Sequence, residues 1–226
     1  MIHRYKGQQM SDTMLMGGLL ALTGGFLDAY TYVSRGQVFA NAQTGNIVLL
    51  GMNLAAGEFS KALRYIIPIA AFAVGIYVVE WVRKLFLAHK TIHWRQIVLA
   101  AEMLLLLGVA FLPQSMNSVA NCLVSFICAL QVQSFRKIRG NALATTMCTG
   151  NLRSATELIY RYHATGDRTS LKRGCQYYLI IAIFLLGAAV GNLCTRQWGI
   201  YAVLICVFLL LAAFTLMFIR PELEDA

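Results

Sequence analysis

Long apolar runs alternate with short polar segments along most of this chain. Six runs approach the roughly 20 residues that a helix needs to cross a bilayer, and they lie at about Met14–Ser34, Tyr65–Val82, Gln96–Leu112, Asn117–Phe135, Cys175–Cys194 and Trp198–Ile219. A bilayer core offers no water to backbone polar groups, so only helices or closed barrels span it. The pattern therefore predicts an all-α integral membrane protein with six transmembrane helices.

Two further stretches, Val38–Gly57 and Ala142–Ile159, are apolar but carry Asn, Gln, Thr or Gly at their centres. Cytoplasmic loops of membrane proteins carry an excess of Lys and Arg. With six spans, 15 of these residues lie on the side of the N-terminus and 4 on the other, whereas eight spans divide them 10 to 9. We therefore expect six spans with both termini in the cytoplasm, and two segments that enter the bilayer as re-entrant or broken helices.

The two ambiguous stretches resemble each other. Asn41–Asn46 aligns with Thr146–Asn151 at an offset of 105 residues, and both end in Thr-Gly-Asn. Three flanking pairs follow in the same order: Arg35-Gly36 with Arg139-Gly140, Phe72-x-x-Gly75 with Phe184-x-x-Gly187, and Trp94 with Trp198, where each tryptophan is expected to begin the last span of its half. Such self-similarity predicts a duplicated unit within one membrane domain covering residues 1–226, with repeats at about 12–113 and 117–219.

Each unit holds three full spans, so the second copy enters the membrane from the opposite side. The halves are then expected to form two inverted three-helix repeats, each with an interrupted or re-entrant Thr-Gly-Asn segment. We expect the Thr44 and Thr149 segments to meet near the bilayer centre, with Thr capping a helix, Gly permitting a close or left-handed backbone and Asn bonding free backbone groups. Two helix N-termini at one point create a partly positive site. The alternative is an ordinary turn, or small residues that serve close helix packing.

The composition agrees with a membrane protein and excludes a soluble domain. The 226 residues are 58% apolar and 13% charged, with a mean hydropathy of +0.63. The net charge of +9 is explained by cytoplasmic loops, so we expect no nucleic-acid partner. The six cysteines lack paired spacing and are interpreted as small buried residues rather than disulfides or zinc ligands. No metal and no cofactor are predicted.

Three motifs carry a family resemblance. They are Gly24-Gly25-Phe26-Leu27-Asp28-Ala29, Gln37 to Asn46 and Ala144 to Asn151. Over about residues 12–219 the chain resembles the YoaK family of bacterial multi-pass membrane proteins, which implies a place in the bacterial cytoplasmic (inner) membrane. Because the family is a domain of unknown function, it implies little about chemistry. Where a glycine and a Gln-Asn pair are expected late in the fourth span, this chain has Ala129 to Gln133, which leaves Gln131 as the candidate site residue.

Asp28 lies late in the first apolar run, shortly before the Thr44 segment. A carboxyl group inside a bilayer is costly and is often functional. We expect it either to bind a proton, a cation or a passing charge, or to form an ion pair with Arg35 or Arg139 that fixes the position of its helix.

Two glutamates within the apolar runs have different surroundings. Glu102 has no cation near it in the sequence, so we expect it to be protonated and hydrogen-bonded, or paired across helices, with a role in proton or ion coupling. Glu80 precedes Arg83 and Lys84 by 3 and 4 residues, which is the spacing of local ion pairs on a helix.

No catalytic motif is present, and the protein is not expected to be an enzyme. The four histidines, His3, His89, His93 and His163, all fall in predicted loops. His89 and His93 have metal-compatible spacing, but neighbouring basic residues favour a solvated loop. Gly187-x-x-x-Gly191 is a close-packing motif, for use within the bundle or at the interface of a homodimer.

These features predict a transporter or channel-like permease for a small molecule or ion, with a midplane site between the two broken segments. An anionic or polar solute is favoured, with proton coupling through Asp28 or Glu102. The substrate-binding candidates are Asp28, Asn41, Thr44, Gly45, Asn46, Gln131, Thr146, Thr149, Gly150 and Asn151. The alternative is a non-transporting scaffold or accessory subunit whose basic loop, from Arg136 to Arg173, docks a partner or anionic lipid of the bilayer.

Overall fold

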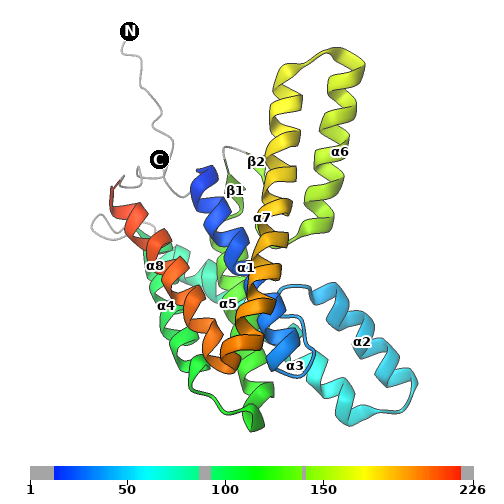
Figure 1. Cartoon of the computed structure of the whole chain (residues 1–226), viewed down its shortest axis with the longest axis vertical. Helices are drawn as coiled ribbons and strands as arrows, with labels where there is room; N and C mark the ends of the chain where they lie inside the picture. Colours follow the sequence, from blue (N-terminus) through cyan, green and yellow to red (C-terminus); the bar gives the residue numbers. More distant parts are fainter. Residues whose placement is uncertain (1–12, 87–92, 139–140, 220–226) are drawn as a thin grey trace.

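The computed structural model describes residues 13–86, 93–138 and 141–219, and these are almost entirely helical (Figure 1). The helices are α1 (Met14–Ser34), α2 (Gln43–Ala55), α3 (Phe59–Phe86), α4 (Trp94–Ala110), α5 (Asn117–Ser134), α6 (Cys148–Thr165), α7 (Arg168–Trp198) and α8 (Leu204–Ile219). The short elements are the 3₁₀ helices η2 (Gln114–Met116) and η3 (Gly199–Val203) and the antiparallel strands β1 (Lys137–Ile138) and β2 (Asn141–Ala142). Every predicted apolar run forms a helix.

Three stretches of the described chain are long and apolar enough to cross a membrane. They are Phe59–Phe86, Gln114–Ser134 and Arg168–Phe218, and the last of these holds both α7 and α8. The predicted membrane class therefore agrees with the structure. The count of six crossings stays a prediction.

The start of α7 lies earlier in the chain than the apolar run that predicted it. Asp167 caps this helix, since its carboxylate accepts hydrogen bonds from the backbone N–H groups of Thr169 (2.9 Å) and Ser170 (3.1 Å). The Ser170 hydroxyl also donates to Asp167 and, with the Thr169 N–H, holds the pKa of that carboxyl below its ordinary value. Polar capping thus adds residues to α7 that hydropathy alone does not assign to it.

The correspondence between the two tryptophans is wrong in one respect. Trp94 begins α4, as expected, but Trp198 ends α7 instead of beginning the last helix. The chain then turns through η3 before α8 begins at Leu204. The paired Arg139-Gly140 lies outside the described residues.

The helices pack in pairs that are preserved when α1–α4 are exchanged with α5–α8. Helix α1 packs against α7, and α5 packs against α3. In the same way α2 packs against α3 and α6 against α7, while α4 contacts α5 and α1 contacts α8. Helices α2 and α6 each form a hairpin with the next helix and lie at the outside of the bundle (Figure 1).

Glycines allow the closest of these contacts. Gly191 of α7 lies against Phe26 of α1, where an added Cβ would be 2.8 Å from backbone atoms, and an added Cβ at Gly187 would overlap the Leu22 carbonyl. Gly75 of α3 similarly faces Ala129 of α5, at 2.6 Å from a built Cβ. The predicted packing role of Gly187 and Gly191 within the bundle is confirmed, whereas a homodimer stays a prediction.

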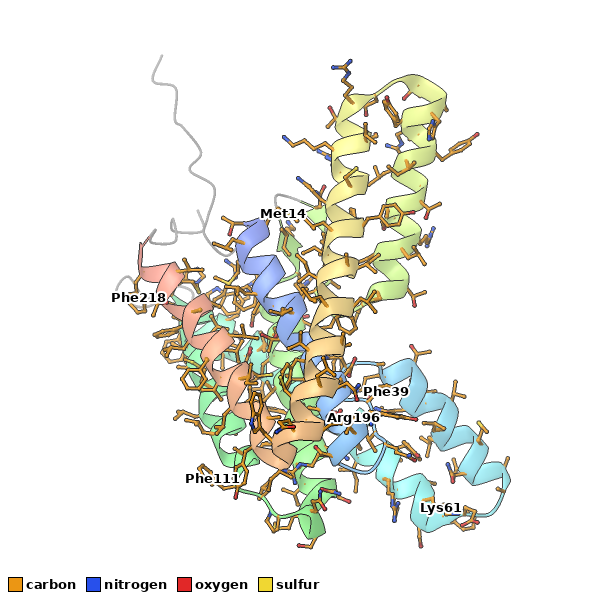
Figure 2. The ribbon with its side chains drawn as sticks, viewed as in Figure 1. Met14, Phe39, Lys61, Phe111, Arg196 and Phe218 are labelled. Atoms are coloured by element: carbon orange, nitrogen blue, oxygen red, sulfur yellow. The ribbon has the colours of Figure 1, made fainter. Side chains whose placement is uncertain are left out.

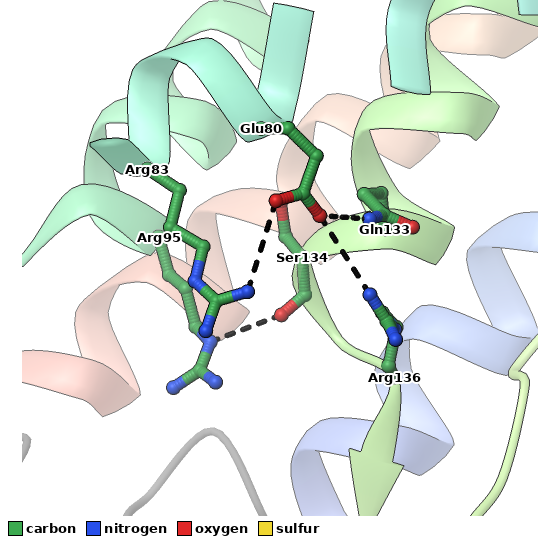
Figure 3. Close-up of polar contacts among 6 residues, drawn as sticks. All are labelled: Glu80, Arg83, Arg95, Gln133, Ser134 and Arg136. Atoms are coloured by element: carbon green, nitrogen blue, oxygen red, sulfur yellow. Dashed lines mark hydrogen bonds and ion pairs between the residues drawn. The ribbon is translucent and has the colours of Figure 1, made fainter. Parts of the chain in front are cut away.

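Basic side chains gather around Glu80 at one end of the bundle (Figure 3). Glu80 accepts a hydrogen bond from Gln133 and forms ion pairs with Arg83 (3.8 Å) and Arg136 (3.6 Å). Arg95 nearby donates to the carbonyl of Ser134 at 3.0 Å. The predicted pair between Glu80 and Arg83 is therefore confirmed. The three arginines were all predicted on the cytoplasmic side, and the structure places them together.

Candidate functional site

A cavity of about 750 Å³ lies between the N-terminal ends of α2 and α6. Its walls come from α1, the segment leading into α2, α3, the segment leading into α6, and α7. Its lining residues are Asp28, Ala29, Tyr32, Val33, Phe39, Asn41, Ala42, Gln43, Thr44, Phe72, Thr146, Met147, Cys148, Thr149, Gly150, Phe184, Ala188 and Asn192. Figure 2 labels Phe39 beside α7, near the start of α2. A cavity of this size is typical of small-molecule sites.

The two Thr-Gly-Asn segments open helices, but not in the way that the sequence predicts. Helix α2 begins at Gln43 after Ala42, and α6 begins at Cys148 after Met147, with no side-chain cap at either start. The prediction that Thr44 and Thr149 cap these helices is therefore wrong. Each is the second helical residue, because the helix begins one residue before it.

The left-handed backbone that glycine permits is not adopted at Gly45 and Gly150, because both lie inside the first helical turn. Left-handed backbone occurs instead at Gly36 and Gln37, where φ is +86° and +61°. These residues turn the chain at the end of α1 into the segment that carries Phe39 and Asn41 toward the cavity. Glycine is suited to such a turn because it lacks a Cβ.

Asn46 and Asn151 make equivalent hydrogen bonds. The Asn46 side-chain amide donates to the Phe39 carbonyl at 2.7 Å, and the Asn151 amide donates to the Ala144 carbonyl at 2.6 Å. Donors and acceptors are both offset by 105 residues, as in the aligned sequence. Both side chains are buried, so each asparagine fastens the segment before its helix to the first helical turn. The prediction that Asn bonds free backbone groups is confirmed.

Asp28 is buried at the cavity wall, with 7% of its surface exposed. Its Oδ1 accepts the backbone N–H of Asn41 at 2.7 Å, and the Asn41 side chain donates to the Gly24 carbonyl at 2.9 Å. The carboxylate therefore lies beside the start of α2, where a helix N-terminus favours negative charge. It also fixes the segment before α2 against α1.

The predicted ion pair between Asp28 and Arg35 is wrong. Arg35 is almost fully buried and points to the end of α4, where it donates to the carbonyls of Val109 and Leu112, both at 2.9 Å. Its Nε donates to the Tyr30 hydroxyl at 2.9 Å. The guanidinium thus bonds two carbonyls at the C-terminal end of α4 and just after it. Arg139, the other proposed partner, lies outside the described residues.

Glu102 and Gln131 lie away from the cavity. Within the described chain neither carboxyl oxygen of Glu102 has a hydrogen-bond partner, so the predicted hydrogen bond or cross-helix pair is wrong. Leu99 and Leu106, one turn away on α4, are fully buried in the main apolar cluster. Gln131 donates to the Leu20 carbonyl at 2.9 Å and to the Thr145 hydroxyl at 3.4 Å. Its side chain joins α5 to α1.

Of the ten substrate-binding candidates, the structure brings six together along the cavity. These are Asp28, Asn41, Thr44, Thr146, Thr149 and Gly150. The other four, Gly45, Asn46, Gln131 and Asn151, are not among the lining residues. The Thr44 and Thr149 segments therefore line the same cavity. Asn46 and Asn151 do not line it, but their hydrogen bonds hold the segments that do.

Sequence reasoning missed the aromatic wall of the cavity. Tyr32, Phe39, Phe72 and Phe184 line it, and the rings of Tyr32 and Phe39 stack with centroids 4.8 Å apart. A signal existed for two of them, because Phe72 and Phe184 are the aligned aromatic residues of the two repeats. No signal in the sequence singled out Asn192, which comes from the far part of α7.

One member of the histidine pair, His93, lies within the described residues. His93 caps α4. Its ring accepts the backbone N–H of Arg95 at 3.3 Å, and the backbone N–H of His93 donates to the Gln96 side chain at 3.1 Å. His3 and His89 lie outside the described residues. Within the described ranges no group of three or more His, Cys, Asp or Glu side chains comes together.

Comparison with known proteins places the chain among membrane proteins of undetermined activity. Residues 16–216 match the family described as "Protein of unknown function (DUF1275)". The chain is similar to the UPF0700 transmembrane protein YoaK of Bacillus subtilis (strain 168), with 28% identity over 185 residues that cover 76% of this chain and 79% of the relative. No solved structure matches.

Proposed function

The chain belongs to the DUF1275 family of proteins of unknown function, and we propose that it is a small-solute transporter or channel-like permease of the bacterial cytoplasmic membrane. The solute binds in the cavity between the starts of α2 and α6. One observation carries the proposal: two segments 105 residues apart, both ending in Thr-Gly-Asn, line a single cavity of about 750 Å³. The proposal is also that the protein binds and moves its solute without catalysing a reaction.

The helix arrangement supports an inverted repeat as the basis of this function. The pairs α1 with α7 and α5 with α3 exchange when the halves exchange, and the Asn46 and Asn151 bonds are equivalent. Many transporters are built from inverted repeats, with solute sites where discontinuous helices meet near the midplane. We further propose that the chain crosses the membrane six times and that both termini lie in the cytoplasm.

Asp28 is the residue to which we assign proton or ion coupling. It is the carboxyl group that lines the cavity, so a change in its protonation acts directly on a bound solute. Glu102 is buried in α4 away from the lining, and a coupling role for it stays a prediction.

A scaffold with a basic docking loop remains the second candidate, and one observation favours it. The hairpin of α6 and the start of α7 projects from the bundle (Figure 1) and exposes several basic side chains. They include Arg153, Arg161, Arg168, Lys172 and Arg173. Anionic lipid attracts such clusters. A cavity with polar groups at the level of the two helix starts is what transport requires and a scaffold does not.

The test compares solute binding and flux in wild type and in a Thr44→Val/Thr149→Val variant. Both threonines are exposed at the cavity and valine keeps their shape, so the fold is expected to persist. A solute library is screened by thermal shift, and each hit is then measured for flux in proteoliposomes. We expect the variant to bind a hit about tenfold more weakly, because two hydrogen bonds are lost.

Thr215→Val is the matched control, because Thr215 lies in α8 and does not line the cavity. It is expected to keep wild-type flux. The proposal fails if wild type moves a solute at the same rate as the Thr44→Val/Thr149→Val variant, or if proteoliposomes move none of the solutes that stabilise the protein.

A further inference from the structure

The charge of the cavity wall has one sign. Among the described residues that line the cavity, Asp28 is the one carboxylate, and none is Lys, Arg or His. A carboxylate with no basic side chain beside it in the cavity attracts cations and repels anions. The sequence favoured an anionic or polar solute because helix N-termini are partly positive. The position of Asp28 at the cavity wall favours a cationic solute instead.

Asp28 already occupies the positive end of α2. Its carboxylate accepts the Asn41 N–H at 2.7 Å, which removes that donor from any solute. Beside it, the Asn41 side-chain oxygen is buried and has no hydrogen-bond partner among the described residues. The acceptor that this part of the wall offers is the Asp28 carboxylate, and a solute that carries N–H donors or a positive charge satisfies it.

Aromatic rings complete the surroundings of the carboxylate. Tyr32 and Phe39 stack with an interplanar angle of 22°, and Phe72 and Phe184 line the cavity with them. The face of an aromatic ring attracts organic cations, and cages of such rings bind ammonium groups. The volume of about 750 Å³ suits an organic molecule rather than a bare metal ion.

We infer that the solute of this cavity is an organic cation, an ammonium group attached to an apolar body. The ammonium group lies near Asp28 and Asn41 and against the rings of Tyr32 and Phe39, and the apolar body lies along Phe72 and Phe184. This inference rests on the proposed function, because it names the class of solute for the same cavity. The competing role for Asp28 is purely structural, as the acceptor that fixes the segment before α2.

The experiment measures binding of three matched compounds to detergent-purified full-length protein by titration calorimetry and thermal shift. The compounds are 2-phenylethylammonium, the neutral 2-phenylethanol and the anionic phenylacetate. Wild type is expected to bind the ammonium compound most tightly. Asp28→Asn keeps an oxygen for the Asn41 N–H but removes the charge, so it is expected to bind the ammonium compound about tenfold or more weakly. Binding of the alcohol is expected to stay the same.

Two further variants separate the charge from the fold. Glu157→Gln removes an exposed carboxylate of α6 that does not line the cavity and is expected to leave all three affinities unchanged. Phe39→Leu keeps an apolar side chain but removes one ring, and is expected to weaken the ammonium compound about fivefold or more relative to the alcohol. This second loss keeps the inference testable if Asp28→Asn does not fold.

Three outcomes overturn the inference: tighter binding of phenylacetate than of the ammonium compound, equal affinity of wild type and folded Asp28→Asn for the ammonium compound, or no binding of the ammonium compound at all. None of them touches the proposed function, because that is judged with whichever solutes the unbiased screen finds. Loss of flux in Thr44→Val/Thr149→Val together with preference for an anion would keep the transporter and discard the cation.

Discussion

Gly25→Ala is expected to destabilise the protein by at least about 3 kcal/mol, the upper part of the range for overpacked cores. Gly25 of α1 faces α7 so closely that an added Cβ overlaps the carbonyl oxygen of Phe184 and lies 2.9 Å from the backbone nitrogen of Ala188. Backbone atoms of a helix cannot relieve this overlap by a change of rotamer, as a side chain can. The two helices must therefore separate. Phe184 and Ala188 both line the cavity, so separation also disrupts the site.

The measurement is the free energy of unfolding in mixed micelles of SDS and a mild detergent, with Gly108→Ala as the matched control. Gly108 lies in α4, and an added Cβ there meets nothing within 4 Å. Its replacement is expected to be neutral or to stabilise by up to about 1 kcal/mol, because alanine favours helix. Equal stability of Gly25→Ala and Gly108→Ala would show that α1 and α7 do not approach as described.

Arg35→Met is expected to cost about 3 to 5 kcal/mol, because it leaves buried groups without their donor. The guanidinium bonds the Tyr30 hydroxyl and the carbonyls of Val109 and Leu112, and 1% of the residue is exposed. The Arg35 carbonyl in turn accepts the side chain of Asn121 at 2.7 Å. Loss of the side-chain hydrogen bonds of Arg35 therefore loosens both the end of α4 and the segment that carries the cavity wall.

Two variants give this prediction its controls, with unfolding in micelles again as the measurement. Arg35→Lys keeps the charge but not the planar fork of donors, so we expect it to recover only part of the stability. Arg64→Met removes an exposed arginine and is expected to change stability by about 0.5 kcal/mol or less. Wild-type stability of Arg35→Met would mean that the arginine does not bond the end of α4.

The positions of the helices follow from the sequence because apolar runs of this length have few alternatives in a bilayer. The meeting of the Thr44 and Thr149 segments could also be predicted from the sequence. It required only a repeat and a count of charges, both of which are properties of the whole chain. Six of the ten predicted substrate-binding residues line the cavity for this reason.

The partners of individual side chains were out of reach because they are distant in the sequence. Arg35 bonds the Val109 carbonyl, 74 residues away, and no local pattern distinguishes this from an ion pair with Asp28. The helix starts at Gln43 and Cys148 were missed for another reason, since no side chain caps either helix and Asp28 of α1 bonds the Asn41 N–H, two residues before α2 begins. Capping statistics describe only residues adjacent in the chain.

Cross-linking tests the claim that the starts of α2 and α6 enclose one water-accessible cavity. In a variant without native cysteines, Thr44→Cys and Thr149→Cys are treated with a charged, water-soluble reagent that carries two thiol-reactive ends. We predict one reagent joined to both cysteines within a single chain, as read by intact mass. The control pair, Met52→Cys with Tyr160→Cys, lies farther along the same helices on exposed residues and is predicted to take two separate reagents. Two separate reagents at positions 44 and 149 would contradict the claim.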